Sequence, residues 1–483
     1  NGQRVSPLSP VPYPYPEDGA SYRDKFRHKL HLQYSHHRFD AWIRYTRGGE
    51  AEVASQNFAM TRPMAELRDS GIGYQQLTLF VQYNQQIREH LRLNYRFSFD
   101  IDDAQRKLSD ARGYYAARED EYFGRVMLHW EPAPQHKLAV GAAFSYEIFG
   151  KKSVGYPGKP PVILVSLPPA GERLSSWHTK NYSLLGEYQW SLTEKWIAFF
   201  GMRLDNHTYT DWLFSPRAAL IYLPTGRDTV KLIYNRSVRR AEDGDLRRQY
   251  LVMRKKGDVE EIDMLELRYE RKQNEALSLA VAGYYADYDV VAWSFDADSS
   301  IPLGRLKYYG LEFEVGYTGK RARLTASHNY TKHLDFDLAS NTTVRQNVSA
   351  SPYGYGDDLA NWSSHSTKLA VSYDLAEAWR LDGSLRVLWG YPGGKDLAQY
   401  NRDWLRNDAR LPVTDGAEDA WEESVFLNAG IEYAPNENTT LRLDLYNVLG
   451  EFDEHLNKRN FFQRTSQWRD EAAAVALTAR YRF

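Results

Sequence analysis

The chain has 483 residues, no cysteine and a formal net charge of −2, and 42% of its residues are hydrophobic. The absence of cysteine excludes disulfides and thiolate metal sites, and the nearly neutral charge gives no reason to expect nucleic acid as a partner. No stretch approaches the roughly 18 consecutive apolar residues of a membrane helix. The 35 Tyr and 13 Trp are many for this length, and they are typical of aromatic girdles at a membrane interface.

Residues 1–23 are rich in proline, which lacks a backbone donor, so this segment is expected to form a loop. Residues 24 onward contain segment after segment in which apolar and polar residues alternate. The clearest case is residues 91–99, where Leu, Tyr and Phe alternate with Arg, Asn and Ser. A period of two sends successive side chains to opposite faces of a strand.

About nineteen strands are predicted, most of them long enough to cross a bilayer at a tilt. Their approximate ranges are 26–34, 39–45, 77–83, 91–99, 122–130, 138–146, 182–190, 196–205, 213–223, 229–239, 265–270, 277–285, 311–317, 322–331, 366–374, 381–390, 425–433, 439–447 and 472–483.

Between these strands, short turns alternate with long polar loops. The long loops are expected at about 48–73, 104–117, 151–180, 241–260, 338–362, 394–423 and 455–470. Short turns on one side of a membrane and long loops on the other are typical of outer-membrane barrels. A large soluble β-protein or a β-propeller is the alternative, but no repeat of fixed period supports a propeller. The fold class predicted is therefore all-β, a large antiparallel transmembrane β-barrel of the outer-membrane type.

The alternation also predicts which side chains face lipid and which face the lumen. The residues expected to face lipid are Leu91, Leu93, Tyr95, Phe97, Leu311, Phe313, Val315 and Tyr317. The residues expected to face the lumen are Arg92, Arg96, Glu312 and Glu314. Lumen charges of this kind, with Arg203, Asp205, Glu266 and Arg268, are expected to pair across strands rather than to form a ligand path.

Several stretches resemble a known family, and they do so in the family's order. Residues 201–240 contain G-x-R-x-D, then S-P-R, then Y-N-x-S-x-R, and residues 446–450 read YNVLG. The chain then closes on the strand ARYRF. Together these stretches resemble the TonB-dependent outer-membrane receptors, and the resemblance covers the chain from about residue 24. The closing aromatic residues Tyr481 and Phe483 would then be the membrane-insertion signal read by the barrel-assembly machinery.

The resemblance implies a location in the outer membrane of a Gram-negative bacterium, in contact with lipid and lipopolysaccharide. It implies energy-coupled uptake of a scarce nutrient, such as a ferric siderophore, driven by the TonB complex through a plug domain. It implies no cofactor and no catalytic activity. The alternative is a barrel without a plug that acts as a passive channel or as a scaffold in an outer-membrane complex.

The domain organisation expected is an extracellular proline-rich segment at 1–23 and a barrel at 24–483, with the plug domain absent from this chain. Family barrels have 22 strands, so the roughly nineteen counted here are expected to be part of a larger barrel. The strands at 24–35 and 472–483 are accordingly expected not to pair directly with each other.

Candidate ligand contacts are basic and aromatic residues in the long outer loops, because arginine suits an anionic ferric chelate and aromatic faces suit catecholate or sugar rings. They are Arg239, Arg240, Arg247, Tyr250, Tyr353, Tyr355, Trp362, Tyr400 and Trp404. The alternative is an interfacial aromatic belt with lipopolysaccharide contacts.

No metal site and no catalytic site are expected. His36 and His37 are neighbours in a short turn, where their side chains point apart, on the side opposite to ligand capture. Loop acids such as Asp243 and Asp245 could suit Ca²⁺, which prefers several oxygen ligands, but a solvated loop is the simpler reading. Nothing in the spacing of Ser, His and Asp indicates a hydrolase constellation.

Overall fold

The computed structural model describes residues 28–51, 71–107, 114–155, 176–294, 299–338, 363–390, 424–451 and 474–482. Over these residues the chain forms a single sheet of 19 strands, all paired antiparallel to their neighbours. The prediction of an all-β antiparallel fold is confirmed. The expected loop at residues 1–23 lies outside the described residues.

The first ten strands are β1 (His28–His36), β2 (Phe39–Ala51), β3 (Gly71–Arg88), β4 (Leu91–Lys107), β5 (Tyr114–Ala133), β6 (His136–Lys152), β7 (Trp177–Ser191), β8 (Trp196–His207), β9 (Trp212–Thr225) and β10 (Asp228–Arg240). The others are β11 (Val259–Lys272), β12 (Leu277–Ser294), β13 (Ser299–Thr318), β14 (Ala322–Leu338), β15 (His365–Ala376), β16 (Trp379–Trp389), β17 (Ser424–Asn436), β18 (Thr439–Tyr446) and β19 (Ala474–Tyr481).

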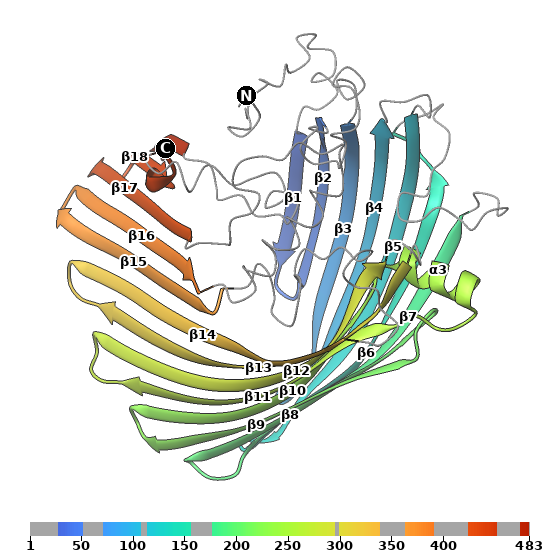
Figure 1. Ribbon diagram of the computed structural model, residues 1–483, viewed down its shortest axis with the longest axis horizontal. Coiled ribbons are helices and arrows are strands. Elements are labelled where there is room, and N and C mark those ends of the chain that lie inside the picture. The colour runs from blue at the N-terminus through green and yellow to red at the C-terminus, as the bar shows by residue number, and fades with distance from the viewer. Residues whose placement is uncertain are drawn as a thin grey trace, which may run out of the picture.

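Each strand pairs with the next strand in the chain, so the sheet is one continuous meander. Figure 1 shows the sheet strongly curved, with β1 and the last strands on separate walls of a trough whose floor is formed by the middle strands. No pairing between β1 and β19 is found within the described ranges. The extent of the complete barrel stays a prediction.

The two faces of the strands differ as the alternation predicted. On the apolar face of β13, Leu311 is 42% exposed and Phe313 is 50% exposed. The next residue, Glu314, lies on the opposite face and binds Arg268 of β11. The same apolar face continues over the neighbouring strands and includes Leu184, Met202, Phe214, Leu232 and Leu267. So much exposed apolar surface is rare on a soluble monomer and suits contact with hydrocarbon.

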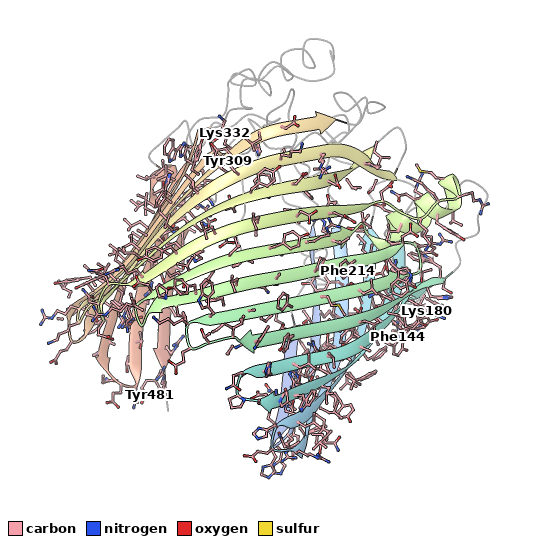
Figure 2. The ribbon with its side chains drawn as sticks, turned by 90° about the horizontal axis from the view of Figure 1, so that it is seen from below. Phe144, Lys180, Phe214, Tyr309, Lys332 and Tyr481 are labelled. Carbon is pink, nitrogen blue, oxygen red and sulfur yellow. The ribbon has the colours of Figure 1, made fainter. Side chains whose placement is uncertain are left out.

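Aromatic side chains follow the short-turn end of this apolar face. Trp196 stacks on Tyr222 of the next strand at 4.3 Å between ring centroids, and Trp379 stacks on Tyr433 at 4.5 Å. Exposed members of the row are Trp130, Trp190, Trp196, Tyr269, Tyr317, Tyr373, Trp379 and Tyr481. Figure 2 shows Tyr481 at the edge of the sheet. A row of this kind is the aromatic girdle of a barrel at the membrane interface.

One prediction about the connections is wrong. Residues 241–260 were expected to be a polar loop, but they contain helix α3 (Asp243–Met253) and the first residues of β11. A short 3₁₀ helix, η2 (Val448–Glu451), follows β18. No helix in the described part of the chain is long and apolar enough to cross a membrane.

The facing of β13 and β14 can be tested with two matched substitutions. Phe313→Arg places a charge on the apolar face and is expected to cost about 2–4 kcal/mol of folding free energy in a bilayer. Ser327→Arg places the same charge on the opposite face, directly across from Glu314, and is expected to cost less. Urea titration of folding into lipid vesicles measures both. Equal costs for the two variants would contradict the facing.

Candidate functional site

Helix α3 lies at the end of the sheet where the long connections are, between β10 and β11 (Figure 1). Asp243 and Asp245 stand in its first turn, where negative charge is favourable to the helix dipole. The helix ends at Arg254, which adopts a left-handed conformation with φ of 55° and donates its backbone N–H to the carbonyl of Tyr250. The acidic start and this C-cap fix the helix within a segment that is otherwise polar.

The first turn of α3 is anchored to β7 and β8. Thr179 of β7 donates its hydroxyl to Asp243 Oδ2 at 2.8 Å, and His207 Nε2 of β8 lies 3.4 Å from Asp243 Oδ1. Both partners are almost fully buried. Arg240, at the end of β10, places its Nε 3.3 Å from the same Oδ1. Asp243 therefore joins three strands to the helix.

The second half of α3 is anchored to β13. The amide of Gln249, which is fully buried, donates to the carbonyl of Ser300, and its Oε1 accepts from the backbone N–H of Asp258 at 3.0 Å. Ser300 in turn donates its hydroxyl to Asp245 Oδ2 at 2.9 Å. The helix thus bridges from β7 and β8 to β13, and its position is fixed at both ends.

Aromatic rings pack around the helix. Trp177 of β7 stacks on Phe149 of β6 at 4.1 Å, and the Arg247 guanidinium lies 5.1 Å above the Trp177 ring. Tyr250 lies 5.5 Å from Tyr209. Of these groups Tyr250 is the exposed one, with 44% of its surface accessible.

A row of carboxylates lies beside this helix on the inner face. Asp100 of β4 is directly opposite Glu121 of β5, and Glu121 is directly opposite Glu147 of β6. Asp102 and Glu119 are also directly opposite each other, two residues further from the short turns. Like charges directly opposite each other on neighbouring strands are destabilising, so positive charge near this wall is favourable.

The ionisation of these groups follows from their surroundings. A tilted strand crosses a bilayer in about 9–11 residues, so Glu119 and Glu147 lie outside it, counted from the short turn between β5 and β6. Burial, together with the charge of Asp243, raises the pKa of Glu147 to about 7. Burial, together with the charge of Asp102, raises the pKa of Glu119 to about 7. Burial opposes ionisation of Asp243 as well, but the neighbouring His207 imidazole and the charge of Arg240 outweigh it and lower its pKa.

Deeper along the inner face, several charges are paired. Arg268 of β11 reaches across β12 to Glu314 of β13, with Nη2 and Oε2 2.6 Å apart. On β12, Ala282 is opposite Arg268 and Ala280 is opposite Glu314. These small side chains leave room for the ion pair to cross β12. A hollow of about 1350 Å³ lies against this part of the wall, and Arg268 and Glu314 are among its lining residues.

Comparison with protein families gives one match, described as "TonB dependent receptor-like, beta-barrel", which covers residues 14–448. The chain belongs to this family of TonB-dependent receptor β-barrels. The predicted family and the predicted class of outer-membrane barrel are thereby confirmed. A comparison with curated proteins returns no match.

Solved structures of receptors in this class have the same fold. The siderophore receptor PirA from Acinetobacter baumannii superposes with a TM-score of 0.65 and 11% identity, over 94% of this chain and 70% of that chain. A variant of the ferric enterobactin receptor PfeA from Pseudomonas aeruginosa gives 0.62 and 13%, over 87% and 63%. The FrpB iron transporter from Neisseria meningitidis gives 0.63 and 11%, over 87% and 67%. The chain therefore spans about two thirds of the length of these receptors.

Four of the nine predicted ligand contacts of this receptor barrel lie in the described residues. Arg239 is well exposed and pairs with Glu260, and Tyr250 is exposed on α3. Arg240 lies between Glu147 and Asp243, and Arg247 is buried over Trp177. The structure brings these four together around α3 but gives Arg240 and Arg247 internal partners. Those outside the described residues are Tyr353, Tyr355, Trp362, Tyr400 and Trp404.

The predicted insertion signal is described at one of its two positions. Tyr481 closes β19 and is 60% exposed, whereas Phe483 lies outside the described residues. Thr179, His207 and Gln249, which hold α3, were not predicted from the sequence. One usable signal was present, since acids at 243 and 245 followed by Leu246 and Gln249 are typical of a helix start. Among the described residues, no group of three or more possible metal ligands is found.

The carboxylate row predicts that α3 docks more firmly in mildly acidic solution. Free glutamate has a pKa near 4.3, whereas Glu147 and Glu119 have a pKa of about 7 in the folded chain. The docking of α3 therefore loses stability as the pH rises from about 4.3 to about 7. Asp243, with its lowered pKa, stays ionised throughout. Hydrogen exchange of the α3 amides, corrected for intrinsic rates, is expected to be slower at pH 5.5 than at pH 8.

The matched variants for this experiment are Glu147→Gln and Glu437→Gln. Glu147→Gln removes one titrating group and is expected to slow exchange at pH 8 and to reduce the pH dependence. Glu437→Gln, in the short turn between β17 and β18, serves as the control and is expected to change neither. A pH dependence that Glu147→Gln leaves intact would refute the assignment.

Proposed function

We propose that this chain forms the barrel wall of an outer-membrane receptor that imports a scarce nutrient such as a ferric siderophore, with energy supplied through TonB. The observation that carries the proposal is the family match over residues 14–448, which coincides with a sheet that is apolar on one face and charged on the other. The siderophore and iron receptors with this fold support the choice of nutrient class. The host would be a Gram-negative bacterium.

Ligand contacts are proposed at the end of the sheet that carries α3. Arg239 and Tyr250 present their side chains to solvent there, and Tyr353, Tyr355, Trp362, Tyr400 and Trp404 are proposed to join them from the outer loops. Arg240 and Arg247 have internal partners, so their proposed part is to hold α3 in place. Arginine and aromatic faces together suit an anionic chelate with catecholate rings.

The proposed partners follow from the same class of receptor. A plug domain would fill the lumen and connect it to the TonB complex, the barrel-assembly machinery would insert the chain, and lipid with lipopolysaccharide would surround the apolar face. The activity proposed is binding and transport, without a catalytic step.

Uptake of radiolabelled iron as a ferric catecholate chelate, in the native host, tests the proposal. Deletion of the gene is expected to reduce uptake, and removal of TonB is expected to reduce it to the same level. Uptake that depends on the gene but not on TonB would favour a passive channel. Uptake that depends on neither would exclude this nutrient class.

The aromatic contact can be tested by Tyr250→Ala. Loss of one stacking interaction is worth about 0.5–1.5 kcal/mol, so affinity for the ferric catecholate is expected to fall about two- to tenfold at equal surface expression. Lys255→Ala is the control, because Lys255 pairs with Asp258 in the neighbouring loop. Whole-cell binding of the labelled chelate measures both. If Tyr250→Ala binds as tightly as the unmodified receptor, the contact is assigned wrongly.

A further inference from the structure

The apolar face of β16 is bounded by a tryptophan at each end. Trp379 and Trp389 are the first and last residues of this strand, and they are 40% and 36% exposed. The strand has 11 residues, which matches the roughly 9–11 residues that a tilted strand needs to cross a bilayer. Trp379 lies at the short-turn end, so Trp389 marks the opposite membrane interface, on the side of the long connections.

Trp389 belongs to a row of four rings that crosses β13, β14, β15 and β16. It stacks on His365 at 3.7 Å between ring centroids, with only 4° between the ring planes. His365 lies 4.8 Å from Tyr330, and Tyr330 lies 6.2 Å from Tyr309. Tyr330 is directly opposite Leu311 of the apolar face, and His365 is directly opposite both Tyr330 and Trp389. The row therefore lies on the side of the sheet that faces lipid.

Contacts within the protein fix the orientation of these rings. His365 Nδ1 lies 3.4 Å from His328 Nε2, and His328 Nδ1 lies 2.8 Å from the hydroxyl of Thr367. Gly390 follows Trp389 with a φ of 70°, and an added Cβ there would lie 3.2 Å from the His365 ring. The glycine thus leaves the space in which His365 lies flat against Trp389. A surface that is already ordered loses little entropy when it binds a partner.

An exposed lysine stands at the edge of the row. Lys332 of β14 is directly opposite Tyr309, and it follows Tyr330 by two residues on the same face, about 7 Å along the strand. Figure 2 shows Lys332 and Tyr309 close together. Among the described residues, no carboxylate oxygen lies within 4.0 Å of the Lys332 ammonium. Lys307, by contrast, pairs with Asp335 at 3.6 Å.

The level of this patch decides what kind of partner meets it. Aromatic girdles lie at the height of the lipid headgroups, and the apolar face below them is covered by acyl chains. An anion that reaches Lys332 from this side is therefore the phosphate of a lipid. The proposed function places the long connections at the outer surface of an outer membrane, where the lipid is lipopolysaccharide. Its membrane anchor, lipid A, carries phosphates on a disaccharide of amino sugars.

We propose that Lys332 and the ring row Tyr309, Tyr330, His365 and Trp389 bind the phosphorylated disaccharide of one lipopolysaccharide molecule. The ammonium of Lys332 pairs with a phosphate, and the flat rings pack against the sugar. This inference rests on the proposed function for the location of the protein. It adds a defined lipid site on the outside of the wall, away from the lumen and from the ligand contacts around α3.

Native mass spectrometry of the protein, purified from outer membranes in a mild detergent and freed of lipid, tests the site. The probes are diphosphoryl lipid A, enzymatically dephosphorylated lipid A and phosphatidylglycerol, which has a phosphate but no sugar. Each probe is titrated, and the half-saturating concentration is measured for the first lipid molecule that binds. Diphosphoryl lipid A is expected to bind several-fold more tightly than either of the others.

The variants are Lys332→Gln, Lys332→Arg and Lys320→Gln. Lys332→Gln is expected to raise the half-saturating concentration of diphosphoryl lipid A about fivefold, the effect of one lysine near an anionic headgroup. Lys332→Arg keeps the charge and is expected to retain binding. Lys320→Gln is the control, because Lys320 is exposed in the turn between β13 and β14, at the other membrane interface. It is expected to bind as the unmodified protein does.

The ring row is tested by Trp389→Leu, which keeps an apolar side chain but removes the stacking surface. It is expected to weaken binding of diphosphoryl lipid A several-fold and to leave phosphatidylglycerol unaffected. Should this variant fail to insert, the Lys332 variants, which alter only an exposed side chain, still decide the matter.

Three results would each overturn the proposal. Lipid A does not bind the unmodified protein, or it binds Lys332→Gln as tightly, or phosphatidylglycerol and dephosphorylated lipid A bind as tightly as the diphosphoryl form. Neither iron nor TonB takes part in this measurement. Ferric uptake can therefore fail while lipid A still binds, and loss of the lipid site leaves the uptake experiment to be judged separately.

Discussion

The backbone hydrogen bonds of a sheet placed in hydrocarbon are the constraint on which the rest of this structure depends. No water is available there to satisfy an unpaired N–H or C=O group, so each strand must pair along its length with a neighbour. The chain meets this requirement by the simplest route, an antiparallel meander in which every described strand pairs with the next one. Once pairing is fixed, the alternation of side chains is fixed too. One face then meets lipid with residues such as Phe313, and the other face is free to carry charge.

Small residues decide which of those charges can meet. Arg442 of β18 reaches Asp382 of β16 across β17, and it does so beside Gly430, where an added Cβ would lie 2.9 Å from the Arg442 guanidinium. Arg268 and Glu314 pass over alanines of β12 in the same way. A larger residue on the middle strand would hold the flanking side chains apart, and each charge would then remain alone in a partly buried position at a considerable cost. The pairing of the inner wall is thus encoded in residues that carry no charge at all.

The strands could be predicted from the sequence because their signal is local. The alternation in residues 91–99 and 311–317 needs no knowledge of any other part of the chain, and both segments are strands with the expected facing. Helix α3 could not be predicted in the same way, because it is held by Thr179, His207 and Ser300, which are distant in sequence. The ligand candidates show the same limit. Residue type selected Arg240 and Arg247 as ligand candidates, but whether an arginine is available to a ligand depends on neighbours such as Glu147 and Trp177, which only the fold brings near.

The surroundings of α3 also explain how the row of carboxylates on β4, β5 and β6 can be tolerated. Asp100, Glu121 and Glu147 are consecutive in one row, and full ionisation of all three would oppose the pairing of β4, β5 and β6. Two features relieve this repulsion. Arg240 supplies positive charge to Glu147 and Asp243 together, and the raised pKa of Glu147 lets it hold a proton near neutral pH. A change of charge on Glu147 of β6 acts on α3, because Glu147 shares Arg240 with Asp243, the first residue of this helix. The other end of the helix is bound to β13 through Gln249. Helix α3 therefore connects the end of the carboxylate row to β13.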